Sequence, residues 1–193
     1  MKKALMIVSI LLVAVISTAC INNIAVQELN NKASEYMQKG DYEAAMSRLQ
    51  ASIDLDSTVY QTYYNLGVAA INANQYQKAI DALETGISLK PDFYEFYYSM
   101  GIAQIGLADD IIDEAKFEEN ASADTESGNV EIKHIITDED KLQSCVLREG
   151  AIKNLQKYLQ HNPNSKDKEL IEEMIKQSEE YISAIEKKDV VNQ

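Results

Sequence analysis

An internal repeat with a period of 34 positions limits what this chain can fold into more than any other feature of its sequence. Displacing the sequence by this period aligns Tyr42 with Tyr76, Ala45 with Ala79, Leu49 with Leu83, Ile53 with Ile87, Tyr63 with Tyr97, and Gly67 with Gly101. A fixed period of about 20 to 50 residues is typical of repeat proteins, in which each unit is one supersecondary element and successive units stack. We therefore expect a stack of similar units.

Each unit has the pattern of two helices joined by a polar turn. Apolar residues recur at helical spacing over segments of about 14 residues. The turns read "QKGDY" (38–42) in one unit and "NANQY" (72–76) in the next. Gly67 and Ala79 occupy positions where the two helices of one hairpin would cross, because larger side chains there would push the helices apart. The pattern predicts helix-turn-helix units and an all-α fold.

The best-preserved unit contains "YYNLGVAAINANQYQKAIDALETGISLKP" (63–91), with characteristic residues at Tyr63, Leu66, Gly67, Tyr76, Ala79 and Pro91. In this it resembles the tetratricopeptide repeat. The first unit, 26–59, is weaker, with Lys32 where Leu is expected and Ser57 where Pro is expected. The resemblance covers 26–163 and implies a right-handed superhelical stack of three hairpins, the second of them over 60–93.

The third unit, 94–163, is interrupted between its two helices. It opens in register at Tyr94, but Asp113 stands where the small residue equivalent to Ala79 should be. Ala151, Leu155, Leu159 and Pro163 instead follow Ala79, Leu83, Ile87 and Pro91 at a common offset of 72 positions. The third hairpin is therefore predicted to be complete and to carry a 38-residue insertion at about 108–145.

We expect the insertion to lengthen both helices of the third hairpin by about 12 residues, with the two still packed on each other. Stripes at helical spacing are formed by Ile105, Ala108, Ile112 and Ala115 in the first helix, and by Leu142, Cys145 and Val146 ahead of Ala151 in the second. Thr137, followed by three acids, is a favourable helix start. Between the helices we expect a mobile tip, with a short strand at Val130 to Ile136 as an alternative for part of it.

The acidic insertion is interpreted as a solvated, self-repelling loop, with a site for a metal or for a basic partner as the alternative. The stretch "DTESGNVE" lacks the alternating oxygen ligands and the sixth-position glycine of a calcium loop. His134 and Cys145 stand at no recognised zinc-ligand spacing. We therefore expect no metal and no other cofactor.

Residues 164–188 are predicted to form a C-terminal capping helix that starts near Ser165, and 189–193 a short tail. One face of this helix carries Ile171, Met174, Ile175, Tyr181, Ile182 and Ile185. A stack of hairpins leaves its last apolar face bare, and a terminal helix covers it. A helix lying on a membrane is the alternative, disfavoured because its polar face carries more acid than base.

The stretch 1–19 has the pattern of an export signal. Lys2 and Lys3 precede an uncharged apolar run from Ala4 to Ile16. The following "STAC" resembles the lipobox of bacterial lipoproteins, which implies lipidation of Cys20 and a tether over 20–25. Ordinary cleavage into the soluble phase and an uncleaved anchor over 4–21 remain alternatives. Each alternative places the remaining chain outside the cytoplasm, and the favoured one anchors it to a membrane of the bacterial cell envelope.

Charge and cysteine content exclude other classes of protein. The chain has 18 basic and 31 acidic residues and a net charge of −13, which removal of Lys2 and Lys3 with the signal would change to −15. Such a field repels phosphate backbones, so we expect no nucleic-acid partner. Cys20 and Cys145 are the only cysteines, which excludes a disulfide framework.

In the resembled family, peptides lie along the concave face formed by the first helix of each repeat. The equivalent positions here are Gln27, Asn30, Ser34, Met37, Tyr64, Asn65, Val68, Ile71, Glu95, Tyr98, Ser99, Ile102 and Ile105. Some members of the family bind a peptide carboxylate with a clamp of basic residues at these positions. Only Asn65 matches that clamp, and Glu95 is acidic where a basic residue would be needed. The resemblance therefore implies a partner with an apolar segment and basic flanks. The alternative is that these side chains mostly pack against the next repeat.

These features favour a membrane-anchored scaffold that binds a protein or peptide partner. A homo-oligomeric structural protein of the envelope without a peptide ligand is the alternative. An enzyme is disfavoured because the sequence has two histidines, no glycine-rich phosphate loop and no nucleophile motif.

Overall fold

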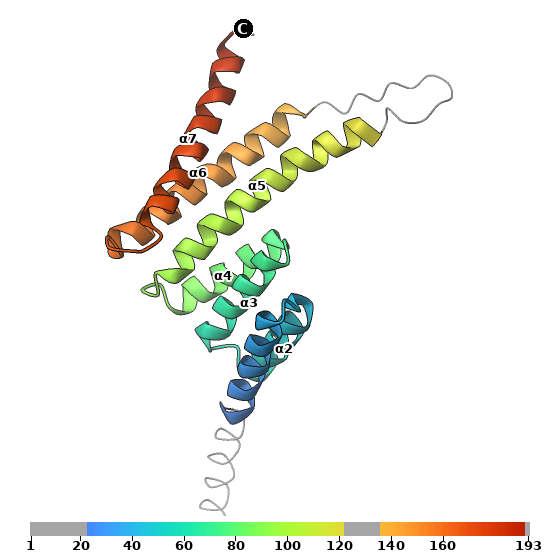
Figure 1. The fold of residues 1–193 in the computed structure, drawn as a ribbon, viewed down its shortest axis with the longest axis vertical. Coiled ribbons are helices and arrows are strands. Elements are labelled where there is room, and N and C mark those ends of the chain that lie inside the picture. Colours follow the sequence, from blue (N-terminus) through green and yellow to red (C-terminus); the bar gives the residue numbers. More distant parts are fainter. Residues whose placement is uncertain (1–22, 122–135, 192–193) are drawn as a thin grey trace, which may run out of the picture.

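A computed structural model describes residues 23–121 and 136–191, and it is helical nearly throughout. A first helix over 23–38 is followed by α2 (Tyr42–Leu55), α3 (Tyr60–Asn72), α4 (Tyr76–Leu89), α5 (Glu95–Ala121), α6 (Asp138–His161) and α7 (Lys168–Val191). Consecutive helices pair into hairpins that stack along the long axis of the molecule (Figure 1). The predicted all-α stack of three hairpins with a terminal helix is confirmed.

Several predictions concern residues that lie outside the described part of the chain. These are the export signal over 1–19, Cys20, the tip between the long helices, the C-terminal end at 192–193, and all but the last residue of the strand considered at Val130 to Ile136. Residues 23–25, assigned to a tether from the sequence, belong to the first helix, in which Gln27 Nε2 donates to Asn23 Oδ1 at 2.9 Å.

The turns inside the first two hairpins repeat each other in backbone conformation. Gly40 has φ of 75°, and Asn74, at the equivalent position of the second hairpin, has φ of 56°. Glycine adopts this left-handed conformation without strain, and asparagine is among the few other residues that tolerate it. Asp41 then caps α2, because its side chain accepts from the Ala44 backbone N–H at 3.1 Å.

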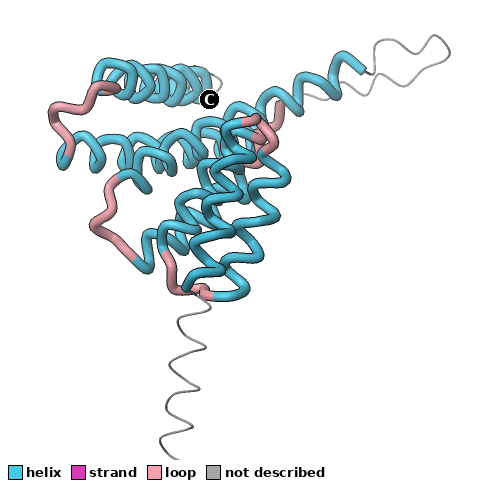
Figure 2. Tube along the Cα trace, turned by 60° about the horizontal axis from the view of Figure 1, so that its bottom comes forward, coloured by secondary structure: helices cyan, strands magenta, loops and turns pink. Residues whose placement is uncertain are grey.

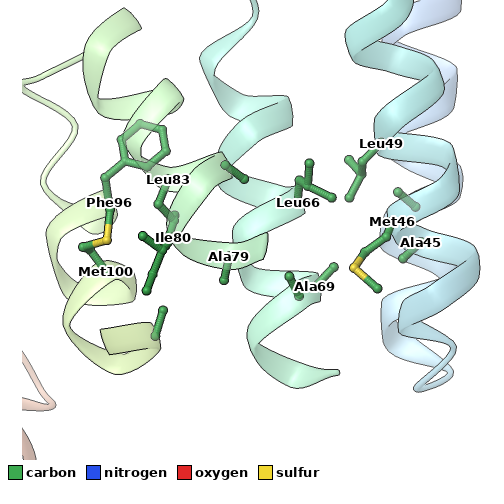
Figure 3. Packing of buried hydrophobic residues seen from close by; sticks show 14 residues of the cluster. Ala45, Met46, Leu49, Leu66, Ala69, Ala79, Ile80, Leu83, Phe96 and Met100 are labelled. Carbon is green, nitrogen blue, oxygen red and sulfur yellow. The ribbon is translucent and has the colours of Figure 1, made fainter. Parts of the chain in front are cut away.

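The core is a continuous row of buried apolar side chains (Figure 3). In that view Ala45, Met46 and Leu49 of α2 lie toward Leu66 and Ala69 of α3, and Ala79, Ile80 and Leu83 of α4 lie between α3 and Phe96 and Met100 of α5. A Cβ on Gly67 would lie 2.6 Å from Leu83 Cγ. The close crossing of α3 and α4 therefore requires glycine at position 67.

The third hairpin repeats this crossing despite its insertion. A Cβ on Gly101 of α5 would lie 2.6 Å from Leu155 Cγ of α6, so Gly101 and Leu155 take the places of Gly67 and Leu83. The hydroxyl of Tyr97 donates to the Pro91 carbonyl at 3.1 Å, as Tyr63 does to the Ser57 carbonyl. The larger offset read from the sequence therefore identifies the true second helix of the third repeat.

Both helices of this hairpin are longer than their counterparts. α5 has 27 residues and α6 has 24, whereas α3 has 13 and α4 has 14. They run side by side beyond the rest of the stack (Figure 1). Thr137 caps α6 as predicted: its hydroxyl accepts from the Asp140 N–H at 3.1 Å, and the Asp140 carboxylate accepts from the Thr137 N–H at 2.9 Å.

The stripe predicted for the extension of α6 is wrong. Leu142 and Val146 are exposed and Cys145 is only partly buried, whereas Ser144 and Arg148 are buried. Counting back from Ala151 by three and then four residues reaches Arg148 and Ser144, so the buried face keeps helical spacing and changes from apolar to polar. Ser144 Oγ donates to the Ala108 carbonyl at 3.2 Å, which satisfies the buried hydroxyl.

On α5 the predicted stripe is correct as far as side chains are described. Ala108 and Ile112 are buried and Ile105 is partly buried, while the side chain of Ala115 lies outside the described part.

The terminal helix begins later than predicted. Ser165 does not cap α7: its hydroxyl accepts from the Asp167 N–H at 3.3 Å in the preceding turn, and α7 starts at Lys168. α7 packs on α6 as the last layer of the stack (Figure 2). Ile171 is fully buried, and the other five residues of the predicted face are partly buried: Met174, Ile175, Tyr181, Ile182 and Ile185.

Candidate peptide-binding face

The first helix of each hairpin contributes to one face that runs along the stack. Helix 23–38, α3 and α5 supply it, and we call it the inner face. These three helices contain all the positions predicted from the sequence: Gln27, Asn30, Ser34, Met37, Tyr64, Asn65, Val68, Ile71, Glu95, Tyr98, Ser99, Ile102 and Ile105. Gln27 and Ser34 are exposed, Ser99 is buried, and the others are partly buried. Met37, Tyr64 and Ile71 also pack against the core.

Two amides join the first and second repeats on this face. Asn65 Nδ2 donates to Asn30 Oδ1 at 3.1 Å. Asn30 Nδ2 in turn lies 2.9 Å from Ser52 Oγ and 3.0 Å from Thr62 Oγ1. Asn30 therefore has a structural role that the sequence did not reveal, because it satisfies two buried hydroxyls between the hairpins.

The ring of Tyr64 joins the second and third repeats. The ring of Tyr64 meets Phe93 and Phe96 edge to face, with centroids 5.2 and 5.7 Å apart. Burial raises the pKa of Tyr64, a side-chain hydrogen bond with Ser99 opposes this, and the negative charge of Glu95 raises the pKa further. The inner face thus becomes aromatic and acidic toward the third repeat.

Two aromatic pairs lie beside the inner face in the third hairpin. The rings of Tyr98 and Tyr158 have centroids 5.2 Å apart, and those of Tyr94 and His161 are stacked at 3.8 Å. Tyr158 and His161 come from the end of α6. Neither was predicted, because the family resemblance places ligand contacts on the first helix of each repeat alone.

The pKa of Tyr98 is raised, chiefly by burial and then by the charge of Asp167. Asp167 lies in the turn before α7, and Tyr158 OH lies 3.4 Å from Ser165 Oγ in the same turn. The turn between α6 and α7 therefore forms one edge of the aromatic region. Its charge contribution was not predictable without the position of the turn.

A separate cavity of about 260 Å³ lies between α5, α6 and α7. Its walls are formed by Ile105, Asp109, Arg148, Met174, Gln177, Ser178 and Tyr181. Ile105, one of the predicted binding residues, therefore lines this cavity next to α7.

Within the described part of the chain, no group of three or more His, Cys, Asp or Glu residues is placed to hold a metal ion.

Arg148 dominates this cavity. Its side chain is only 10% exposed, its guanidinium forms an ion pair with Asp109, and the central carbon of the guanidinium lies 4.3 Å from the centroid of the Tyr181 ring. No group in the described part of the chain accepts a hydrogen bond from its Nε. Arg148 was missed because the apolar residues ahead of Ala151 suggested a different buried face. Its position three residues before Ala151 was the signal that could have found it.

Models of known protein families match the first two hairpins. Two family models, both described as tetratricopeptide repeat, match residues 29–58 and 60–93. The first two hairpins are therefore similar to tetratricopeptide repeats over the matched residues. These matches agree with the crossing of Gly67 on Leu83 and its recurrence at Gly101 and Leu155 in the third hairpin.

Two solved structures of MamA resemble the chain. The first shares 23% sequence identity over 84% of this chain and 81% of that chain, with a TM-score of 0.41. The second shares 22% over 88% of this chain and 78% of that chain, also with a TM-score of 0.41. A search among curated proteins found no match.

Among the helices of the described residues, none is both long and apolar enough to cross a membrane.

Proposed function

We propose that the protein is a scaffold that binds a protein partner on the inner face of its tetratricopeptide repeats. The observation that carries this proposal is the continuity of that face across three repeats. Asn30 bonds to Asn65 between the first and second repeats, and the ring of Tyr64 packs edge to face on Phe93 and Phe96 between the second and third. Partly buried apolar side chains between these junctions provide surface that a bound segment could cover.

We further propose that the scaffold is exported and held at a membrane of the bacterial cell envelope by lipid on Cys20. The basic start, the apolar run and "STAC" in the sequence support this. Metabolic labelling with a fatty acid tests it, since label in the wild-type chain should be lost in Cys20→Ser. Equal labelling of both chains would contradict lipidation at this residue.

Affinity capture of the tagged, full-length protein from its native membrane tests the scaffold. We would introduce lysines on the inner face with Val68→Lys and Ile102→Lys. A matched control places lysines on exposed positions of the second helices, with Gln50→Lys and Thr85→Lys. Both variants change the net charge by the same amount.

Partners that disappear from the inner-face variant and persist in the control would support the proposal. Equal recovery from both variants would show that binding occurs elsewhere. Circular dichroism of both variants establishes that the helical stack is retained.

A homo-oligomeric structural role remains the second candidate because α6 exposes two large apolar side chains. Leu142 is 65% exposed and Val146 is 59% exposed, one turn apart on the same side of the helix. Light scattering on the purified chain tests this role. A stable oligomer that dissociates in Leu142→Glu with Val146→Glu, without any captured partner, would favour it over the scaffold.

A further inference from the structure

Three tyrosines and two carboxylates gather where the second and third repeats meet the turn before α7. We call Tyr64, Tyr98, Tyr158, Glu95 and Asp167 the tyrosine–acid cluster. They come from α3, α5, α6 and the turn before α7, and each of the five is partly buried. The cluster therefore has rigid helical supports and an accessible surface.

The contacts within the cluster place its members together. The rings of Tyr98 and Tyr158 lie 5.2 Å apart at an interplanar angle of 31°. Glu95 lies three residues before Tyr98 on α5, and Tyr158 OH lies 3.4 Å from Ser165 Oγ in the turn that holds Asp167. Besides burial, the charge of Glu95 raises the pKa of Tyr64 and the charge of Asp167 raises the pKa of Tyr98. Tyrosine faces and two negative charges thus surround one region of the inner face.

Neither carboxylate of the cluster is neutralised by a basic residue in the described part of the chain. The ion pairs there join other acids to lysine or Arg148, and none includes Glu95 or Asp167. Two negative charges close to half-buried rings create a negative potential that a cation would neutralise.

Elsewhere in the same molecule, tyrosine rings are covered by the chain's own cations. Lys157 Nζ lies 3.8 Å from the centroid of Tyr97, and the guanidinium of Arg148 lies 4.3 Å from that of Tyr181. These are favourable cation–π distances. Among the described cations, none lies over Tyr64, Tyr98 or Tyr158.

We propose that the tyrosine–acid cluster binds a cationic side chain, lysine or arginine, of the protein partner. This inference rests on the proposed scaffold function and specifies which chemistry its inner face recognises. The rings supply cation–π attraction and the two carboxylates supply charge and hydrogen-bond acceptors. An acidic or C-terminal carboxylate ligand is excluded from this position because Glu95 and Asp167 would repel it.

The test uses small probes and the full-length chain in neutral detergent micelles, with tyrosine labelled with carbon-13 in the ring. The probes are N-acetyl-arginine methylamide, N-acetyl-lysine methylamide, and N-acetyl-citrulline methylamide, which has the shape of arginine without its charge. Tyrosine signals are assigned by single Tyr→Phe substitutions. We expect saturable shifts of the cluster signals with arginine or lysine, and binding weaker by about threefold or more with citrulline.

Charge and ring contributions are separated with matched variants. Glu95→Gln with Asp167→Asn should weaken binding of the cationic probes by about three- to tenfold or more. Glu84→Gln with Glu179→Gln removes the same charge from exposed positions and should leave binding unchanged. Tyr98→Phe keeps a ring and should retain binding, whereas Tyr98→Leu should reduce it.

Equal binding of arginine and citrulline, or no shift with either cation, would overturn the inference. So would equal weakening by the cluster variant and its charge-matched control. These outcomes differ from failure of the scaffold proposal, which would appear as unchanged partner capture by the Val68→Lys and Ile102→Lys variant.

Discussion

The crossing of Gly101 on Leu155 makes a quantitative prediction about the third hairpin. A Cβ added at Gly101 would lie 2.6 Å from Leu155 Cγ and 2.7 Å from Leu155 Cδ2. Since nonbonded carbons prefer separations of about 3.5 to 4.0 Å, Gly101→Ala forces a displacement of about 1 Å. We expect overpacking to cost about 1–3 kcal/mol, offset by about 1 kcal/mol of improved helix propensity.

The companion change, Leu155→Ala, removes a fully buried side chain and should destabilise the fold by about 2–5 kcal/mol. The double variant should be less destabilised than the sum of the single changes by about 1–2 kcal/mol. The reason is that alanine at 155 relieves the clash, and the new methyl at 101 fills part of the resulting cavity.

Urea unfolding followed by circular dichroism provides the four free energies of this double-mutant cycle. The same cycle at Gly67 and Leu83 should show coupling of the same sign, because the Cβ contact there is also 2.6 Å. The mismatched pair, Gly101→Ala with Leu83→Ala, is the control and should be additive. Additivity within about 0.5 kcal/mol for Gly101 and Leu155 would refute their equivalence to the earlier pair.

Three further predictions concern the cap, the helix start and the inner face. Asp109→Ala should destabilise the chain by about 1–3 kcal/mol because it leaves Arg148 buried without its ion-pair partner. Arg148→Met removes the buried charge and should cost less. Thermal unfolding measures both losses of stability, and a larger loss for Arg148→Met than for Asp109→Ala would contradict this prediction. Thr137→Ala removes the hydroxyl that caps α6, so it should lower the free energy of unfolding in urea by about 1 kcal/mol and speed amide exchange at the start of α6. Unchanged exchange there would count against the capping role of Thr137. The pKa values of Tyr64 and Tyr98, like that of Tyr76, are raised chiefly by burial, so all three should ionise after exposed tyrosines in an absorbance titration. The stabilising contribution of Tyr64 and Tyr98 should be present below about pH 10 and be lost as pH rises through their higher folded-state pKa values. Tyr64→Phe and Tyr98→Phe should each reduce the late-ionising component, and an unchanged late component in both variants would argue against the assignment.

Much of the fold was predictable because the repeat fixes local structure and packing together. The spacing of Gly67, Ala79 and Leu83 indicates both the helical period and the crossing point, so one displacement of the sequence predicts a hairpin. The same logic located Leu155 on the far side of the insertion. The residue types at these crossing positions are determined by packing against the neighbouring helix and not by helix propensity alone.

The buried face of the α6 extension was not predictable from apolar residues. Leu142 and Val146 have strong hydrophobic character yet are exposed, because Ser144 and Arg148 have partners on α5 at Ala108 and Asp109. Hydrophobic pattern alone does not account for buried polar groups that are satisfied by specific bonds.

The inner face was predictable in its first-helix residues and not in its electrostatics. Tyr64 and Tyr98 followed from the repeat, since they are one period apart. Tyr158 and Asp167 belong to α6 and to the turn before α7, and no repeat position indicated their proximity to Tyr98. Contacts of this kind depend on where α7 begins, which the sequence misplaced by three residues.

The long third hairpin also has a consequence for the order of folding. Gly67 and Leu83 are 16 positions apart in the chain, whereas Gly101 and Leu155 are 54 positions apart. Loop-closure entropy then makes the second contact more costly to form by about 1 kcal/mol. Because local contacts form faster than distant ones, we expect the first two hairpins to fold early and α6 and α7 to join a template that already exists.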